Sequence, residues 1–454
     1  MKIARILSAV ITTLLILIGS FVAGFILPDA VKAENAERFI ASLQLLPERI
    51  ERLTDPSRDD DPNKLPIVDT YWTVLTELSE KYYGKKIDRR EMTYSAIRGM
   101  LEALNDPYTR FLDPKESKDM REQNSGNFVG IGAHLDTDKK THQVYILKPL
   151  PDSPAEKILK PGDVIIKVDG KIIAGMDIED VVNMIRGKEG TVVKLTIQRP
   201  KVRKLLEFRI VRQVVQYRIV DWEMLDKEHK IGYIALHGFN EKSDVQFDEA
   251  LALLEDQKMK ALILDLRDNP GGLLTTAIDI GSRFVEGGPI VIIQERGGRR
   301  STLDVEEEKH NHKRYPLVVL INGRSASASE IVAGAIRDNN VGTLVGTTTF
   351  GKGKVQTIVP LNDGSAVSIT TARYLTPNGT DINKIGIKPD VEVENPEPTL
   401  EDMEAERSFI GGSKVRSKND HQLIRAEKIL KEKLSVASGA SMLHQPASAQ
   451  AITR

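Results

Sequence analysis

A serine-rich turn at residues 322–330 contains the residues that could most directly do chemistry. It reads Asn-Gly-Arg-Ser-Ala-Ser-Ala-Ser-Glu and follows the apolar, β-branched run Leu317–Ile321, which is typical of a buried strand. From Ala328 onward the apolar residues recur at helical spacing, so the turn joins a strand to the start of a helix. A nucleophilic hydroxyl is usefully held at such a turn. The competing interpretation is a capping box, with Ser327 as the N-cap and Glu330 reaching back to it.

A lysine in a glycine-rich loop downstream favours catalysis over capping. Lys352 stands in Phe-Gly-Lys-Gly between two strand-like runs, at 343–345 and 355–359. Small residues flank Ser327 and leave space around its hydroxyl. A serine with space around it and a lysine in a flexible loop are typical of a nucleophile and its base, whereas a solvated loop lysine is the plainer alternative.

The same loop resembles a phosphate-binding P-loop, which makes a nucleotide-binding enzyme the rival enzyme class. Two features oppose it. Gly353 replaces the hydroxyl residue that would hold magnesium, and the strand-like run at 355–359 follows where a helix must begin.

The two motifs together, Ser-Ala-Ser-Ala-Ser-Glu-Ile and Thr-Phe-Gly-Lys-Gly-x-x-Gln, resemble the C-terminal processing (tail-specific) serine proteases. The catalytic set of that family is serine, lysine and glutamine. Its serine precedes its lysine by 25 residues, and here 352 − 327 = 25, which selects Ser327 over Ser325 and Ser329. Gln356 follows Lys352 by four residues, as the family requires. The resemblance implies that Ser327 attacks, Lys352 takes its proton and Gln356 orients the lysine.

The resemblance covers the chain from about residue 66 to 434 and implies an α/β multidomain fold. Its parts are an α/β serine-protease core of the crotonase or Clp-protease type, an inserted PDZ domain and a helical N-terminal segment. Beyond Trp222, strand-like and helix-like runs alternate, which is the pattern of an α/β layer architecture. The predicted parts are a signal anchor or signal peptide at 1–33, a helical N-terminal region at 34–112, the PDZ domain at 113–214, the α/β catalytic core at 215–400, a C-terminal helical segment at 401–434 and a disordered tail at 435–454.

The predicted PDZ segment begins with Phe-Val-Gly-Ile-Gly at 128–132. Three further motifs resemble PDZ sequence in order and spacing: Ser-Pro-Ala at 153–155, Lys-Pro-Gly-Asp at 160–163 and Val-Asp-Gly at 168–170. The glycines let successive backbone N–H groups point at one anion, while the adjoining strand edge pairs with a peptide main chain. A plain hairpin turn is the simpler alternative. The residues predicted to bind a peptide carboxylate are Val129, Gly130, Ile131 and Gly132.

A proline-glycine turn is predicted to complete the catalytic site. The segment Asp-Leu-Arg-Asp-Asn-Pro-Gly-Gly at 265–272 ends a strand-like run, and taken alone it is a tight turn. The resemblance makes it part of an oxyanion hole, with N–H groups of Gly271, Gly272 and Ala328 meeting the carbonyl oxygen as it becomes negative.

Composition excludes several other classes of function. The 454 residues carry 64 Lys and Arg against 65 Asp and Glu, so no global field attracts nucleic acid. The absence of cysteine excludes disulfides, thiolate metal sites and a cysteine nucleophile. No cofactor or metal is expected, and neither His237 nor the pair His310 and His312 is assigned a catalytic or metal-binding role.

The N-terminus predicts export. Residues 6–27 are almost continuously apolar and long enough for a bilayer core, and Lys2 and Arg5 precede them. This predicts a bacterial envelope protein on the periplasmic or outer-surface side, tethered to the cytoplasmic membrane. A small-residue site at 31–33 makes a cleaved signal peptide the alternative. The predicted partners are protein substrates bound by their C-termini; a homodimer through the amphipathic segment at 34–53 and an adaptor protein are left open, and a PDZ scaffold that binds without cutting is the different-class alternative.

A lysine base makes a specific demand. An ordinary lysine has a pKa near 10.4, so the pKa of Lys352 must fall by about three units, mainly through desolvation. Gln356 can hydrogen-bond the amine without adding a charge that restores the ammonium form. Lys354, two residues along, is expected on the other face of its strand and is expected to tolerate alanine.

Overall fold

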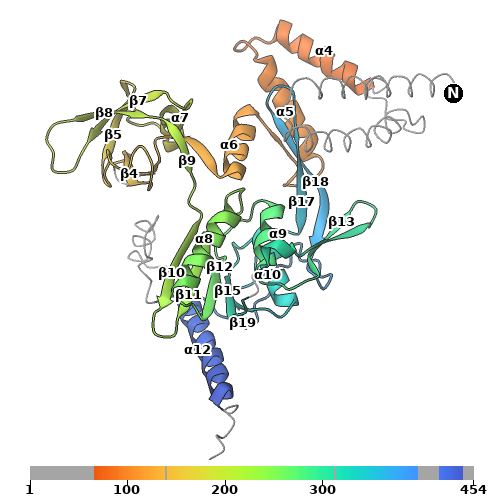
Figure 1. The fold of residues 1–454 in the computed structure, drawn as a ribbon. Helices are drawn as coiled ribbons and strands as arrows, with labels where there is room; N and C mark the ends of the chain where they lie inside the picture. The colour runs from red at the N-terminus through yellow and green to blue at the C-terminus, as the bar shows by residue number, and fades with distance from the viewer. Residues whose placement is uncertain (1–65, 139–140, 311–312, 397–418, 443–454) are drawn as a thin grey trace, which may run out of the picture. The chain divides into compact units, whose positions relative to one another are not determined.

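The computed structural model describes residues 66–138, 141–310, 313–396 and 419–442 in two compact units, one ending at Thr93 and the next starting at Tyr94 (Figure 1). The first unit contains α4 (Pro66–Lys81) and the start of α5 (Arg89–Glu102), joined where the Tyr71 hydroxyl donates to Thr93 Oγ1 at 3.2 Å. The predicted anchor and the amphipathic segment lie outside the described residues. No helix within the described ranges is long and apolar enough to cross a membrane.

A six-stranded antiparallel sheet with one flanking helix forms the predicted PDZ region. The strand order is β3-β4-β5-β7-β8, with β6 beside β5, so β3 is an end strand. α7 packs against β3 and buries Val181 and Ile185 in the apolar core of this region. The elements are α6 (Pro114–Ser125), β2 (Asn127–Gly130), β3 (Ala133–Thr137), β4 (Val144–Pro149), β5 (Val164–Val168), β6 (Lys171–Ile172), α7 (Ile178–Ile185), β7 (Val192–Gln198), β8 (Leu206–Val211) and β9 (Gln213–Gln216).

The α/β core is built on a second sheet of order β10-β11-β12-β15-β16-β19, which is parallel apart from the antiparallel pair β10-β11. Helices α8, α9 and α10 cover one face and α12 covers the other (Figure 1). The elements are β10 (Val220–Asp226), β11 (Ile231–Leu236), α8 (Ser243–Asp256), β12 (Ala261–Asp265), α9 (Leu274–Ser282), η2 (Glu307–Lys309), β15 (Leu317–Ile321), α10 (Ala328–Asp338), β16 (Thr343–Gly346), β19 (Val391–Glu392) and α12 (His421–Met442).

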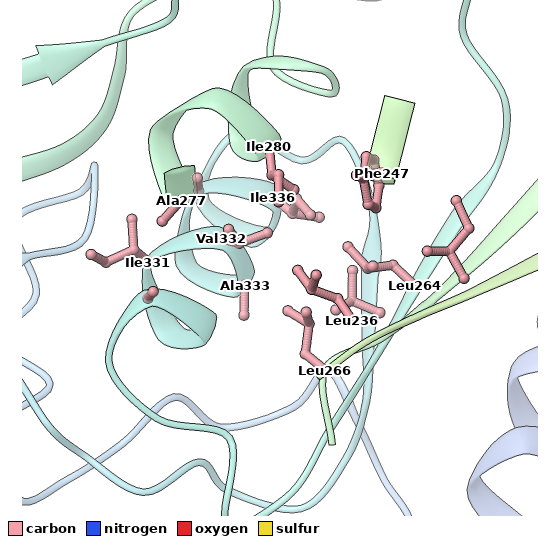
Figure 2. Packing of buried hydrophobic residues seen from close by; sticks show 14 of the residues in the cluster. Leu236, Phe247, Leu264, Leu266, Ala277, Ile280, Ile331, Val332, Ala333 and Ile336 are labelled. Atoms are coloured by element: carbon pink, nitrogen blue, oxygen red, sulfur yellow. The ribbon is translucent and has the colours of Figure 1, made fainter. Parts of the chain in front are cut away.

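Helix α10 is fixed by the apolar layer between the sheet and the helices. Because side chains alternate along a strand, Val319 of β15 packs on the α10 side while Val318 packs on the α12 side. Figure 2 shows this layer with its labelled members: Leu236, Phe247, Leu264, Leu266, Ala277, Ile280, Ile331, Val332, Ala333 and Ile336. The start of α10 is therefore held firmly at the carboxyl end of β15.

A smaller sheet carries the lysine loop. Strand β18 (Ala366–Leu375) lies between β1 (Arg110–Leu112) and β17 (Lys354–Pro360), with Ser368 opposite both Arg110 and Ile358. β13 (Pro289–Glu295) and β14 (Arg300–Asp304) extend this sheet from the other end of β18. The segment that leads into β1 is thus brought beside the loop that precedes β17.

Several elements of the core occur where the sequence predicts them. The strand at 317–321 and the helix starting at Ala328 occur as predicted. One boundary is wrong, because α12 continues to Met442, past the predicted helical end at 434 and into the segment predicted to be a disordered tail. The other predicted domain limits stay predictions.

Candidate active site

Ser327 occupies a strained turn between β15 and α10. Its backbone has φ 56° and ψ −113°, a region that L-residues other than glycine rarely adopt. Such strain clusters at functional sites, and a serine on a sharp strand-to-helix turn is a recurring way to present a nucleophile. This conformation distinguishes Ser327 from an ordinary helix cap.

The neighbouring serines have structural roles. The Ser325 hydroxyl is fully buried and donates to the Leu266 carbonyl at 2.8 Å. The Ser329 hydroxyl is also fully buried and donates to the Asn269 carbonyl at 2.9 Å. Ser327 is partly exposed. Of the three serines, it alone is open to a substrate.

The Glu330 side chain joins the serine turn to the lysine loop. Its Oε2 accepts from the Ser327 N–H at 2.9 Å, as the predicted capping box requires, and also from the Lys352 N–H at 2.9 Å. Its Oε1 accepts from the Gly351 N–H at 2.7 Å and from the Thr349 hydroxyl at 2.6 Å. The residue is 1% exposed, so these bonds form away from water, where they are stronger. One carboxylate therefore fixes two segments that are 22 residues apart.

Tyr374 adds a second connection between the same segments. Its hydroxyl lies 3.1 Å from the Ser327 carbonyl oxygen and also donates to the Lys352 carbonyl. No local sequence signal indicates this role, because Tyr374 belongs to β18 and reaches the site only through the sheet.

Lys352 has the environment that a base needs. Burial lowers the pKa of Lys352 below its ordinary value, the nearby positive charge of Arg110 lowers it further, and the Glu330 carboxylate opposes both. The direction agrees with the prediction. The Lys352 ammonium also lies 4.9 Å from the centre of the Tyr108 ring.

The expectation for Lys354 is wrong in its geometry. Lys352 lies in the loop before β17 and Lys354 is the first residue of that strand, yet both ammonium groups lie near the same Tyr108 ring, that of Lys354 at 5.7 Å from its centre. The Lys354 ammonium donates to Asp106 Oδ1 at 2.9 Å. Lys354 thus lies beside Lys352 and forms an ion pair with Asp106.

Gln356 points toward β18. Its Nε2 donates to Thr370 Oγ1 at 3.4 Å, and Thr370 is its cross-strand neighbour. An irregularity in strand pairing between Val355 and Gln356 shifts its register relative to Lys354. Among the described hydrogen bonds, none joins Gln356 to the Lys352 amine.

The proline-glycine turn meets the serine turn, but one predicted oxyanion donor is already used. A Cβ on Gly271 would lie 2.8 Å from Ser327 Cβ and 2.9 Å from Ala328 N, so the close approach requires glycine. The Gly271 N–H, however, donates to Asn269 Oδ1 at 2.9 Å, which corrects its predicted role. Neither Gly272 N–H nor Ala328 N–H has an acceptor within the described part of the chain, and both stay candidates.

The rival chemistries find little support in the geometry. His237, the exposed residue that follows β11, is paired with Asp221 at 3.0 Å, and His310 Nδ1 lies 3.1 Å from the Ser282 carbonyl oxygen. His312 lies outside the described residues. No group of three or more metal-ligating side chains occurs in the part of the chain that the structure describes. Strand β17 follows the glycine-rich loop where a P-loop requires a helix.

The predicted carboxylate-binding loop opens onto a cavity of about 190 Å³. Gly132 has φ 73°, and a Cβ there would lie 2.2 Å from Ser153 Cβ, so only glycine fits. Val129 belongs to β2, where it lies opposite Val214 of β9, and it does not line the cavity. Of the lining residues, the sequence analysis predicted only Gly130, Ile131 and Gly132; those that it missed include Arg186, which donates to the Tyr217 hydroxyl at 3.0 Å, and Tyr217 itself. The cavity is lined by Phe128, Gly130, Ile131, Gly132, Ala133, His134, Leu135, Leu150, Val182, Ile185, Arg186 and Tyr217.

Three family models match successive segments of the chain. Residues 230–393 match peptidase family S41, residues 118–198 match a PDZ domain, and residues 51–116 match the activating protease CtpB N-terminal domain. The carboxy-terminal-processing protease of Bartonella bacilliformis is 41% identical over 324 residues, which is 68% of this chain and 71% of that protein. The carboxy-terminal processing protease CtpB of Bacillus subtilis is 40% identical over 328 residues, 71% of this chain and 67% of that protein. A solved structure described as photosystem II D1 C-terminal processing protease is 35% identical, has a TM-score of 0.43 and covers 76% of this chain and 91% of its own.

The Glu330 connection can be tested by replacing one atom. In Glu330→Gln, an amide NH₂ faces backbone N–H groups that need an acceptor, and each one left unpaired costs about 1–3 kcal/mol. We expect a lower thermal midpoint and a large loss of Ser327 reactivity toward a fluorophosphonate probe. Glu432→Gln, at an exposed position on α12, is the control and should change neither. Full probe reactivity in Glu330→Gln would mean that other contacts hold the two loops.

Proposed function

Because the chain belongs to the carboxy-terminal processing proteases of peptidase family S41 and carries a PDZ domain, we propose that it is an exported endopeptidase that binds protein C-termini and cuts near them with Ser327 and Lys352. Membership of this family makes it a serine-type peptidase, which sets aside the PDZ scaffold that binds without cutting. The observation that carries the choice of residues is the Glu330 carboxylate, which accepts from the N–H groups of both Ser327 and Lys352.

The proposed reaction is acyl transfer in two steps. The neutral Lys352 amine takes the Ser327 proton as Oγ attacks the substrate carbonyl carbon. The resulting oxyanion is stabilised by N–H groups of Gly272 and Ala328, and one such donor is typically worth about 2.7–4 kcal/mol. The Lys352 ammonium then gives its proton to the leaving amine. Lys352, neutral again, deprotonates a water that attacks the acyl carbon, and the Lys352 ammonium then returns that proton to Ser327 Oγ as the acyl bond breaks.

Gln356 orients the lysine in this proposal. A neutral amine can donate to an amide oxygen, which positions it without favouring the charged form. Because the Gln356 amide now donates to Thr370, the productive arrangement requires a rotation of its side chain toward Lys352.

Substrate capture is proposed for the PDZ cavity. End strand β3 and helix α7 form its two sides, so an extended peptide can add to the edge of β3 while its terminal carboxylate meets the loop at 130–132. The Arg186 guanidinium lies in the same cavity over the Phe128 ring, and its charge is shared with Glu122, to which it is ion-paired at 3.3 Å. The predominantly apolar lining favours an apolar last side chain.

The catalytic roles predict a set of activities. Lys352→Ala and Lys352→Arg should both lose on the order of 10⁴-fold in kcat/KM, because neither side chain can act as a base. Activity should rise with pH as Lys352 loses its proton, at a pH below the ordinary lysine pKa because burial lowers the pKa of this amine. Gln356→Glu should shift this rise to higher pH, since a carboxylate favours the ammonium form.

Lys313→Ala, at an exposed position, is the matched control and should be fully active. Near-normal cleavage by Lys352→Ala, combined with loss of cleavage in His237→Ala, would replace the serine–lysine mechanism by a histidine-based one.

The capture step predicts dependence on a free carboxylate. Amidation of a substrate peptide's C-terminus should weaken binding at least severalfold, because charge-assisted N–H contacts are lost. Gly132→Val should weaken binding as well, since its Cβ collides with Ser153. Gly175→Val is the control: it has a similar φ of 76°, but a Cβ there meets nothing within 4 Å. Equal affinity for acid and amide peptides, measured by fluorescence anisotropy, would rule out this capture mode.

The proposed location follows from residues 1–33 and has its own test. A reporter fused after residue 40 should be exported, and the protein should stay with membranes after a salt wash. A soluble mature form that begins at Glu34 would instead show that a signal peptide is cleaved.

A further inference from the structure

The segment at 106–110 lies against the lysine loop, although Asp106 and Lys354 are 248 residues apart in sequence. The Tyr108 ring has the Lys352 ammonium 4.9 Å and the Lys354 ammonium 5.7 Å from its centre. An aromatic face attracts any cation, so the ring by itself does not distinguish the two lysines.

The Asp106 carboxylate distinguishes the two lysines, because it pairs with only one of them. Lys354 Nζ donates to Asp106 Oδ1 at 2.9 Å, whereas the Lys352 ammonium makes no ion pair with any residue that the structure describes. Asp106 also accepts from the Thr109 hydroxyl at 2.9 Å and from the Tyr108 N–H at 3.4 Å. Burial raises the pKa of Asp106, but these bonds, together with those from Thr370 and Lys354, outweigh it and bring the pKa to about 2. Asp106 is therefore negatively charged at neutral pH.

Asp106 is also linked to the third member of the proposed catalytic set. The Thr370 side chain helps to lower the pKa of Asp106, and its hydroxyl accepts from Gln356 Nε2 at 3.4 Å. The Thr370 N–H donates to Thr109 Oγ1 at 3.0 Å, which fixes Thr370 to the same segment. The Asp106 carboxylate thus binds a lysine directly and lies beside the threonine that binds Gln356.

We propose that Asp106 is a positioning residue of the active site: its carboxylate binds Lys354 and thereby leaves Lys352 without an acidic partner. A carboxylate within about 4–6 Å of a lysine stabilises the ammonium form by about one to three pH units. If Asp106 paired with Lys352, the base would stay protonated at neutral pH. Lys354 prevents this by occupying the carboxylate. The inference rests on the serine–lysine mechanism proposed above.

The other charged groups around Lys352 either lower its pKa or already have partners of their own. Arg110 from β1 disfavours the ammonium, and Glu330 from α10 favours it but is occupied by N–H and hydroxyl donors. Arg373, which lies opposite Lys354 on β18, has its own acid in Asp381 at 2.6 Å. Lys354 is accordingly the cation that compensates Asp106.

A double-mutant cycle tests this role through the pH dependence of kcat/KM. In Lys354→Ala, Asp106 loses its cation and attracts the Lys352 ammonium, so the rise in activity should move at least one pH unit higher. Cleavage at pH 7 should then fall about tenfold for each unit. Asp106→Asn alone leaves Lys354 uncompensated and should move the rise to lower pH. The double variant Asp106→Asn/Lys354→Ala should return it close to the wild-type position.

Two controls separate this effect from damage to the fold. Lys354→Arg keeps the ion pair and should keep the wild-type profile. Lys354→Gln removes the charge but retains a donor of similar length, and should shift the profile as Lys354→Ala does if both keep the wild-type thermal midpoint. A purely structural role would lower activity equally at every pH, which would overturn the inference.

The outcomes also distinguish this inference from the mechanism that it assumes. If Lys352→Ala is inactive but Lys354→Ala keeps the wild-type pH profile, only the role of Asp106 is refuted. If Lys352→Ala remains active, the serine–lysine mechanism fails and the role of Asp106 fails with it.

Discussion

The active-site architecture depends on the buried carboxylate of Glu330. It sits in the first turn of α10, where the exposed backbone N–H groups and the helix dipole favour a negative charge. Its two oxygens accept from Ser327, Thr349, Gly351 and Lys352, so a buried charge that would be costly alone is fully hydrogen-bonded. Because one buried side chain binds both loops, it fixes the backbone of Ser327, the proposed nucleophile, relative to the backbone of Lys352, the proposed base. The packing of α10 against the sheet holds this carboxylate in place.

Strain at Ser327 and burial of Lys352 are stabilised by the surrounding fold. The positive φ of Ser327 is held by the Glu330 bond to its N–H and by the close approach of Gly271, where no side chain fits. Lys352 is desolvated by its own loop and by the Tyr108 ring, while Arg110 adds a like charge. These groups come from several elements: the start of α10, the turn at Gly271, the loop before β17 and the segment that leads into β1. The environment of the lysine is therefore a property of the assembled sheet and of no single segment.

The lead-in segment at 106–112 belongs to the active site as much as to the N-terminal region. β1 adds to the edge of β18, and β18 also carries β17 and the lysine loop. Tyr108, Asp106 and Arg110 reach the site because of this pairing. The family match that ends at residue 116 thus includes residues that shape the chemistry of the protease core.

The sequence by itself determined the local parts of this protein, because their signals are short-range. Apolar runs and helical spacing located β15 and α10, and the glycines at 130–132 marked a turn. The resemblance to a known family, through its interval of 25 residues, singled out Ser327 among the three serines. The sequence also indicated that Glu330 caps α10. Only the tertiary structure decided which partners these groups take. Glu330 reaches a second loop, Lys354 pairs with Asp106, Gln356 turns to Thr370 and the Gly271 N–H turns to Asn269. Each of these choices depends on strand register, on a local irregularity in β17 and β18, or on competition between nearby donors and acceptors, and spacing along the chain encodes none of them.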